Sequence, residues 1–328
     1  MKNYDVFVAG CTYDGGIYKY SLDFSGNMEF IQKTPIPDPM YLALSNNKLY
    51  ALLRTPFGGY KSGLINFDIK DDSLEPSQVI TYTLGKAACH FSIDSDGSIF
   101  LVNYLTGNVV KTDASGKILK VVCHAGKGLN EVRQDGPHTH FASFSPDGEY
   151  VCVCDLGLDT IFVYDKELNL VSKAASVPGS GPRHLVFNKK GDTCYCINEL
   201  SNTVTVYDYC KGILKMRESY EMFSENVNST AAAIRISNDD RFLYTSTRGY
   251  DKIISFEISP DGKQLAKIQE TDCMGKDPRD FNITPDGKYM VVANQSGDVS
   301  LFEICKDGTI KFTGKTFSAP GALCVLIK

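Results

Sequence analysis

The chain has 328 residues and a formal net charge of −5 at pH 7, with both signs spread along it, so it lacks the basic surface that nucleic-acid binding requires. Hydrophobic residues make up 43% of the sequence and charged residues 22%, which is typical of a soluble globular protein with a large core. No apolar run approaches the roughly 18 residues that span a bilayer. The N-terminus has no signal-peptide core, and this predicts a cytoplasmic protein that does not bind membranes.

The first third of the chain contains short strands separated by turns. The first repeat begins with what resembles the second strand of a unit, so its innermost strand is missing. The second repeat opens at Tyr41 and the third at Cys89. The predicted strands in this part are residues 6–9, 16–22, 28–32, 41–44, 49–53 and 89–93, followed by outer strands up to about Cys123.

A longer insertion, residues 124–139, separates the third repeat from the fourth. It is polar and rich in glycine, and we therefore expect a surface loop rather than a strand. Long loops on a rigid scaffold often carry function.

The clearest repeat begins at His140. A strand ends at Ser145, Pro146-Asp147-Gly148 forms a tight turn, and strands follow at residues 150–154 and 160–165. The same pattern returns 43 residues later and then twice more, with first strands at residues 183–187, 232–236 and 279–283. A period in the mid-forties built only of strands is typical of a β-propeller.

The end of the chain supplies the missing strand. Residues 320–327 match the innermost strand of the other repeats, with Pro320 in the position of Pro182 and Pro278. The sequence therefore predicts an all-β protein, a seven-bladed β-propeller in which the C-terminal strand completes the first blade. Residues 1–328 form a single domain in this prediction, and closure removes an exposed sheet edge.

The cysteines are expected to be reduced. The chain has eleven, an odd number, and several lie inside predicted strands as Cys-x-Cys pairs, Cys152 with Cys154 and Cys194 with Cys196. We interpret them as small buried hydrophobic residues. No histidine stands beside either pair, so we predict no metal site and no cofactor.

Aligning the repeats places equivalent residues in rings around the central channel. The position at the start of the innermost strand is occupied by Tyr41, Cys89, His140, Arg183, Ala232, Arg279 and Ala322. The loop after the second strand lies at the same end, and its position is occupied by Cys11, Arg54, Tyr104, Leu156, Glu199, Arg248 and Gln295. One solvent-filled mouth of the channel should therefore collect His140, Arg183, Glu199, Arg248 and Arg279.

Each of these residues also has a structural interpretation. Glu199 and Arg248 could be an exposed ion pair between blades, which contributes little to stability. His140 could be a structural hydrogen-bonding residue, and His184 is expected to face the blade packing. Together, however, a carboxylate, an imidazole and several guanidiniums in one concave rim are typical of a site for an anionic ligand. The further candidates for substrate binding are Arg279, His184, Arg54, Tyr104 and Gln295.

These motifs resemble those of the seven-bladed propeller lactonases, a family that includes the propeller-type 6-phosphogluconolactonases and carboxy-cis,cis-muconate cyclase. The matching stretches are Gly10-Cys-Thr-Tyr13, Gly16-Ile-Tyr18, Pro137-His-Thr-His140, Ser145-Pro-Asp-Gly148, Asp155-Leu-Gly157 with Asp159, Gly181-Pro-Arg-His184, Asn198-Glu-Leu200, Thr247-Arg-Gly249 with Asp251, Pro278-Arg279 and Asn294. By motif, the resemblance implies an active site of His140, Arg183, Glu199 and Arg248.

The resemblance implies hydrolysis of a sugar lactone, with 6-phospho-D-glucono-1,5-lactone as the first expectation. His140 or Glu199 would deprotonate water, and Arg183 and Arg248 would hold the carbonyl oxygen or the phosphate. The alternatives are a carboxymuconate-type lactonizing cycloisomerase using the same residues, and a non-catalytic binding platform. The polar insertion disfavours the platform. The expected partner is a small anionic lactone.

Overall fold

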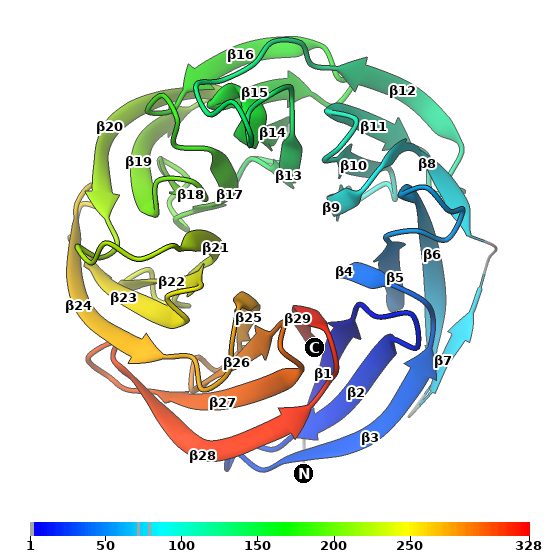
Figure 1. Cartoon of the computed structure of the whole chain (residues 1–328), viewed down its shortest axis with the longest axis vertical. Coiled ribbons are helices and arrows are strands. Elements are labelled where there is room, and N and C mark those ends of the chain that lie inside the picture. The colour runs from blue at the N-terminus through cyan, green and yellow to red at the C-terminus, as the bar shows by residue number, and fades with distance from the viewer. Residues whose placement is uncertain (1–2, 71–72, 78–79) are drawn as a thin grey trace.

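The computed structural model describes residues 3–70, 73–77 and 80–328, and these form seven antiparallel sheets arranged around a central channel (Figure 1). The predicted seven-bladed propeller is therefore confirmed. Within these ranges the single helix is η1 (Leu156–Leu158), and no helix is long and apolar enough to cross a membrane.

The strands of each blade follow one another from the channel outwards. Blade 1 has β29 (Ala322–Ile327), β1 (Tyr4–Gly10), β2 (Gly16–Leu22) and β3 (Met28–Pro35). Blade 2 has β4 (Pro39–Ser45), β5 (Lys48–Leu53) and β6 (Lys61–Lys70), with β7 (Ser73–Pro76) and β8 (Thr81–Lys86) both paired to β6. Blade 3 has β9 (Ala88–Ile93), β10 (Ile99–Asn103), β11 (Asn108–Thr112) and β12 (Ile118–Cys123). Blade 4 has β13 (Thr139–Phe144), β14 (Tyr150–Asp155), β15 (Thr160–Asp165) and β16 (Leu170–Ala175).

The last three blades follow the same order. Blade 5 has β17 (Pro182–Phe187), β18 (Thr193–Asn198), β19 (Thr203–Cys210) and β20 (Ile213–Glu221). Blade 6 has β21 (Thr230–Ile236), β22 (Phe242–Arg248), β23 (Lys252–Ile258) and β24 (Leu265–Asp272). Blade 7 has β25 (Pro278–Ile283), β26 (Tyr289–Asn294), β27 (Asp298–Ile304) and β28 (Ile310–Ser318).

The C-terminal strand closes the ring as predicted. Strand β29 pairs antiparallel with β1, with Val325 opposite Val8, and the two chain ends lie in the same blade (Figure 1). Val325 also packs into the apolar cluster between blades 1 and 7 with Val291 and Leu301. Closure therefore supplies both a sheet partner and part of an interblade core.

The core lies between neighbouring blades, because each blade packs one face against the next. Cys152 and Cys154 of blade 4 pack with Cys194 and Cys196 of blade 5 in one buried cluster. All eleven cysteines are free thiols. The Cys-x-Cys pairs thus serve as compact apolar side chains, as their small volume suits a tight contact between sheets.

Every innermost strand carries an irregularity near its start. In blade 5, Pro182 lies opposite Asn198 and His184 lies opposite Ile197, so Arg183 has no partner in the ladder. One extra residue likewise interrupts each of the other six innermost strands; in β21, Ala232 and Ala233 together lie opposite Ser246. A β-bulge of this kind bends the strand and re-aims the side chain of the extra residue.

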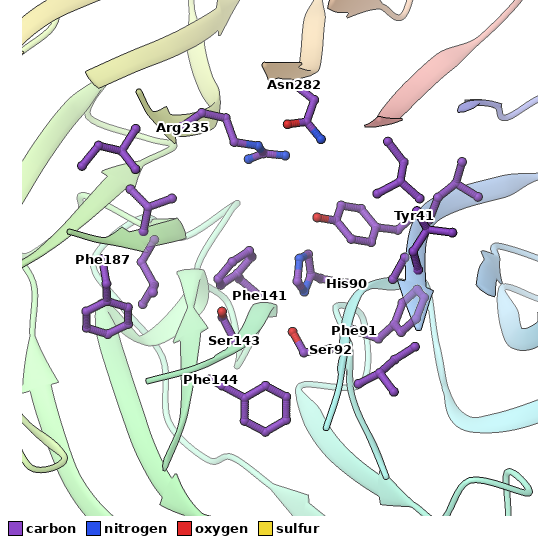
Figure 2. A pocket seen from close by; sticks show the side chains of 18 of the residues that line it. Tyr41, His90, Phe91, Ser92, Phe141, Ser143, Phe144, Phe187, Arg235 and Asn282 are labelled. Atoms are coloured by element: carbon purple, nitrogen blue, oxygen red, sulfur yellow. The ribbon is translucent and has the colours of Figure 1, made fainter. Parts of the chain in front are cut away.

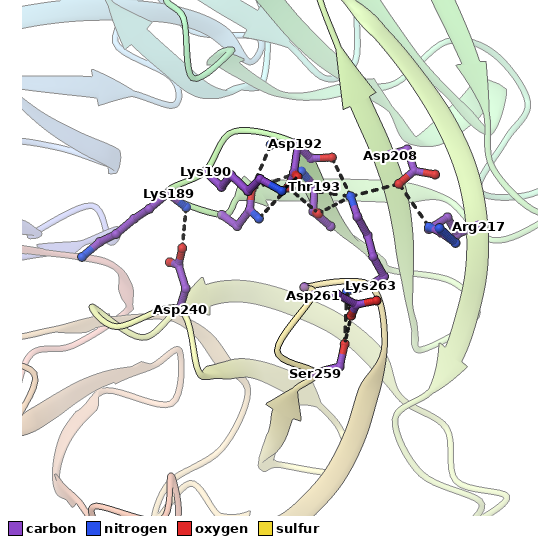
Figure 3. Close-up of polar contacts among 12 residues, drawn as sticks. Lys189, Lys190, Asp192, Thr193, Asp208, Arg217, Asp240, Ser259, Asp261 and Lys263 are labelled. Carbon is purple, nitrogen blue, oxygen red and sulfur yellow. Dashed lines mark hydrogen bonds and ion pairs between the residues drawn. The ribbon is translucent and has the colours of Figure 1, made fainter.

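Ion pairs and hydrogen bonds join blades 5 and 6 at the turns between their strands (Figure 3). Lys263 contacts Asp208 at 2.9 Å and donates a hydrogen bond to Thr193 at 2.7 Å. The backbone nitrogen of Lys189 donates to the carboxylate of Asp240 at 2.6 Å. These groups are partly exposed, so they contribute to blade alignment more than to the free energy of unfolding.

Deleting residues 320–328 should lower the free energy of unfolding by more than about 5 kcal/mol, since each buried apolar side chain of β29 contributes roughly 1.5–3 kcal/mol. Urea unfolding followed by circular dichroism measures this. Lys328→Ala, which keeps the strand intact, is the control and should unfold like the parent protein. An unchanged midpoint in the truncated protein would contradict closure by β29.

Candidate active site

The extra residue of each bulge faces the central channel at one end of the propeller. These residues form a ring in blade order, Leu323, Met40, Cys89, His140, Arg183, Ala232 and Arg279. The ring is chemically divided: one arc carries His140, Arg183 and Arg279, and the other carries apolar and sulfur side chains. The sequence alignment placed Tyr41 and Ala322 in this ring, which was wrong by one residue in both blades.

A second tier of side chains lies above this ring, from the ends of the second strands and the loops that follow. It contributes Arg54, Tyr104, Glu199 and Arg248 to a pocket of about 270 Å³ that also reaches His140 and Arg279. The structure thus brings together the four residues singled out by motif, with Arg183 directly below Glu199. Arg54 and Tyr104 line the same pocket, as the repeat alignment predicted.

Glu199 is the centre of the charge network. Its carboxylate contacts Arg183 Nε at 2.9 Å, Arg248 at 3.1 Å and Arg133 at 2.5 Å. Burial alone would raise the pKa of Glu199, but the guanidiniums of Arg248 and Arg183 outweigh it and hold that pKa well below its usual range. Glu199 is therefore ionised at neutral pH.

His140 lies beside this network in its neutral form. Burial, followed by the positive charge of Arg183, lowers the pKa of His140 well below its ordinary value. Its Nδ1 is buried without a hydrogen-bond partner among the described residues, and the ring meets Tyr104 edge-on at 5.7 Å. The imidazole is therefore neutral near pH 7, and its Nδ1 has a free acceptor or donor position.

The two central residues are more buried than the sequence suggested. Glu199 is 3% exposed and His140 is 4% exposed, whereas a solvent-filled mouth was predicted. The reason is that the bulge turns His140 inward, and the arginines from three directions cover Glu199. Glu199 and Arg248 are thus not an exposed surface pair.

The insertion covers one side of the pocket. The segment between β12 and β13 is mostly exposed, as predicted for a surface loop, but parts of it are fixed firmly to blade 4. Gln134 is buried and donates to the backbone oxygen of Leu156 at 2.8 Å and to Asp159 at 2.7 Å. The side chain of His124 is also buried, with its Nδ1 2.5 Å from Asp155.

Two aspartates of the sequence motifs hold this insertion in place. Asp159 binds Gln134, and Asp155 accepts hydrogen bonds from the backbone nitrogens of His138 and Gly157, at 2.8 and 3.0 Å. Gly157 is required here, because a Cβ on this residue would lie 1.9 Å from the backbone oxygen of Gly136. These aspartates therefore position the loop.

Arg133 is the site residue that the sequence analysis missed. It extends from the insertion into the pocket and contacts both Glu199 and the hydroxyl of Tyr104, at 2.5 and 3.4 Å. His138 of the same loop stacks on Tyr104 with ring centres 4.5 Å apart. The insertion has no counterpart in the other repeats, so the alignment could not assign Arg133 a position. It expected Leu156 on the rim of blade 4, but Leu156 is buried beneath the insertion.

The remaining candidates lie around this pocket. His184 is buried below it and receives a hydrogen bond from Arg183 at 3.2 Å, consistent with a structural position. Gln295 is exposed and lines a separate hollow with Asn228, Asp277 and the outer side of Arg248. Both remain predictions as substrate-binding residues.

A larger cavity of about 830 Å³ opens at the other end of the channel (Figure 2). Tyr41, His90 and Phe141 form its floor towards the pocket, and Arg235 and Asn282 point into it (Figure 2). Arg235 is already paired with Asp280 at 2.7 Å, and the walls are mainly aliphatic and aromatic. The ionisable groups needed for acid–base chemistry are concentrated at the first end.

No cluster of three or more histidine, cysteine, aspartate or glutamate side chains in the described ranges is arranged to hold a metal ion. The network around Glu199 instead matches the binding of an anion, since its acidic group is surrounded by cations that also face the pocket.

Comparison with known proteins identifies the family. The model of the seven-bladed β-propeller lactonases matches residues 5–327. The chain belongs to this family. It is 32% identical to a 6-phosphogluconolactonase from Bacillus subtilis, over 99% of this chain and 98% of that protein.

Solved structures of similar proteins agree in their overall fold. A periplasmic gluconolactonase from Pseudomonas aeruginosa has a TM-score of 0.91 and 25% identity, covering 99% of both chains. A protein from Lactobacillus plantarum has a TM-score of 0.92 and 27% identity over the full length of both. This propeller is thus a lactonase-family protein with its ionisable groups concentrated at one mouth.

Replacing Glu199 by glutamine should lower the free energy of unfolding by about 3–5 kcal/mol, because it leaves the buried Arg183 and its neighbours without their counter-charge. Urea unfolding at pH 7 tests this. Glu257→Gln, on the exposed face of β23, is a matched control and should change stability by less than about 0.5 kcal/mol. If both variants unfold at the same urea concentration, the charge network does not support the fold.

Proposed function

We propose that the protein hydrolyses a sugar lactone, with 6-phospho-D-glucono-1,5-lactone as the preferred substrate. The observation that supports this most strongly is the pocket itself, in which a neutral imidazole adjoins guanidiniums that face a small open volume. Membership of the lactonase family and the name of the Bacillus subtilis relative support the reaction class. Hydrolysis of an activated cyclic ester needs no covalent nucleophile, only a positioned water, a base and a cation for the oxyanion.

In this proposal His140 is the general base. Its pKa is lowered by burial and by Arg183, so it is neutral and free to accept the proton of the attacking water. Glu199 is the weaker candidate, because three guanidiniums already contact its carboxylate oxygens, whereas Nδ1 of His140 has no partner among the described residues. The water oxygen forms a bond to the lactone carbonyl carbon as His140 takes its proton, giving a tetrahedral oxyanion.

The arginines complete the reaction. Nε of Arg248 is buried without a partner among the described residues, and Arg248 lines the pocket, so its guanidinium is available for the developing oxyanion. Glu199 acts on Arg183 and Arg248 by holding both guanidiniums in one orientation. When the tetrahedral species collapses, the ring C–O bond breaks and the proton on His140 passes to the leaving alkoxide, which yields the open hydroxy acid.

A second candidate is the lactonizing cycloisomerase. One observation favours it: five arginines line or underlie the pocket against a single carboxylate, an excess of positive charge that suits a substrate with several carboxylates. The same His140 would then move a proton to or from carbon. For location we propose the cytoplasm, consistent with the eleven free thiols.

Substitution of His140 tests the assignment of the base. His140→Ala should lower kcat on 6-phosphogluconolactone by about two to four powers of ten, the usual contribution of a general base. Rates are measured by titrating released acid and are corrected for spontaneous hydrolysis. Arg217→Gln, which removes an exposed ion pair on the outer strand of blade 5, is the control and should keep the parent rate. Parent-like turnover in His140→Ala would exclude this residue as the base.

The pH dependence provides an independent test. The base must be neutral, and the pKa of His140 lies well below its ordinary value because of burial and Arg183. Enzymatic kcat/KM should therefore be level through neutral pH and decrease only on the acid side, below about pH 6.5, where a free histidine is half protonated. Initial rates between pH 5 and pH 8 check this; a decrease centred at pH 7 or above would contradict a neutral His140 base.

A further inference from the structure

Arg279 differs from the other arginines of the pocket. Arg133, Arg183 and Arg248 each form an ion pair with Glu199. Among the described residues, no side chain forms a hydrogen bond or an ion pair with the guanidinium of Arg279, although this guanidinium lines the pocket. The bulge in β25 directs the side chain into the channel, and the neighbouring position of the ring, in blade 6, holds only Ala232.

The charge on Arg279 has no direct ion-pair partner among the described residues, although the carboxylate of Glu199 attracts it. Burial, together with the positive charges of Arg183 and Arg248, lowers its pKa to about 9. The guanidinium is still charged at neutral pH, and its donors have no side-chain acceptor in the described part of the chain. Arg279 is half-buried by its accessible surface, and a partly desolvated cation that has no ion-pair partner and faces a pocket is characteristic of a site that binds a counter-ion.

A second guanidinium lies on the other side of blade 1. Arg54, at the start of the loop after β5, lines the same pocket as Arg279. Arg54 belongs to blade 2, Arg279 to blade 7, and Cys11 to blade 1 between them. Burial raises the pKa of the Cys11 thiol, and the positive charges of both arginines partly oppose this rise. The carboxylate of Asp38, an acidic group on this side, accepts a hydrogen bond from Thr55 at 2.5 Å. The pocket wall also includes Met40, which offers no charged acceptor.

We propose that Arg279, together with Arg54, forms an oxyanion subsite that binds the phosphate group of the substrate, apart from the residues that act on the ester. The planar fork of a guanidinium matches two phosphate oxygens, and a dianionic phosphate supplies the counter-charge that Arg279 lacks. The subsite lies towards the apolar arc of the ring. Arg248, which lines the pocket, is then left for the lactone carbonyl, and Arg183 remains bound to Glu199. This subsite rests on the proposed function in one respect: the phosphate that it binds is taken to be the phosphate group of the lactone substrate.

A binding experiment tests the subsite without any turnover. The parent protein and Arg279→Gln are titrated by calorimetry with glucose 6-phosphate and with glucose, and their melting temperatures are measured with and without inorganic phosphate. Arg279→Gln should bind glucose 6-phosphate about 10- to 100-fold more weakly, the range for loss of a charge-assisted hydrogen bond. Arg279→Lys keeps the charge but loses the planar fork, so its affinity for glucose 6-phosphate should lie between those of the parent and Arg279→Gln. If the glutamine variant fails to fold, the lysine variant replaces it in the titration.

Stability distinguishes a ligand site from a structural arginine. In phosphate-free buffer Arg279→Gln should melt at a higher temperature than the parent, since it removes a charge that Arg183 and Arg248 repel, and added phosphate should stabilise the parent only. Arg217→Gln is the matched control and should respond to phosphate like the parent. A destabilised Arg279→Gln with parent affinity for glucose 6-phosphate would overturn the subsite, as would a parent protein that binds neither phosphate nor glucose 6-phosphate.

Kinetics then separate this proposal from the proposed function. With the phosphorylated lactone, Arg279→Gln should raise KM about 10-fold or more and change kcat little, whereas hydrolysis of unphosphorylated gluconolactone should be nearly unaffected. Lost phosphate binding in a protein that hydrolyses no lactone would leave the subsite standing and reject the hydrolase. Active parent protein with an unchanged KM in the variant would reject the subsite alone.

Discussion

The bulge at the start of each innermost strand is the feature on which the site depends. In a regular strand, successive side chains point to opposite faces of the blade and pack against the two neighbouring blades. No side chain of such a strand points into the central channel. One extra residue breaks that alternation and directs a side chain inward. The bulge also leaves carbonyl oxygens outside the ladder, and the preceding blade satisfies some of them. Cys89 donates to the oxygen of His140 at 3.2 Å, and Arg183 donates to that of Ala232 at 2.5 Å.

Each of these blades therefore helps to fix the bulge of the next. The thiol of Cys89 in blade 3 holds the backbone that carries His140, and Arg183 in blade 5 holds the backbone of blade 6 while it also binds Glu199. The positions of the ionisable side chains thus depend on the contacts between neighbouring blades. Closure of the ring by β29 therefore supports the site as well as the fold. Strand β29 packs against β25 of blade 7 and β4 of blade 2, so its loss would weaken the contacts of blade 1 with both neighbouring blades.

The sequence carried the fold and the main site residues, and the reasons are local. Turns such as Pro146-Asp147-Gly148 recur in the chain, and Ser145 caps this turn by donating to Asp147 at 2.5 Å, as Ser237 does to Asp239 in blade 6 at 2.6 Å. Such repetition fixes the register of the blades to within one residue. That register placed His140, Arg183, Glu199 and Arg248 at one end of the channel.

The errors arose where a repeat departs from its neighbours. Tyr41 was placed in the ring instead of Met40, because the second repeat turns at Asn46-Asn47 and lacks the Pro-Asp-Gly turn that sets the register of the fourth. Arg133 was missed because its loop occurs once. The burial of Glu199 could not be anticipated either, since it depends on side chains that approach from three separate segments of the chain.

Burial and the guanidiniums together set the protonation states of the site. The guanidiniums around Glu199 keep that carboxylate ionised, and the charge of Arg183 together with burial keeps His140 neutral. A proton is thus disfavoured on both groups in the resting protein, and in the proposed reaction the imidazole accepts one from water as the oxyanion forms. The resulting imidazolium would lie close to the carboxylate of Glu199, which attracts it. Ionised Glu199 therefore favours the charged state that we propose for His140 during the reaction, while burial and the arginines disfavour that state in the resting protein.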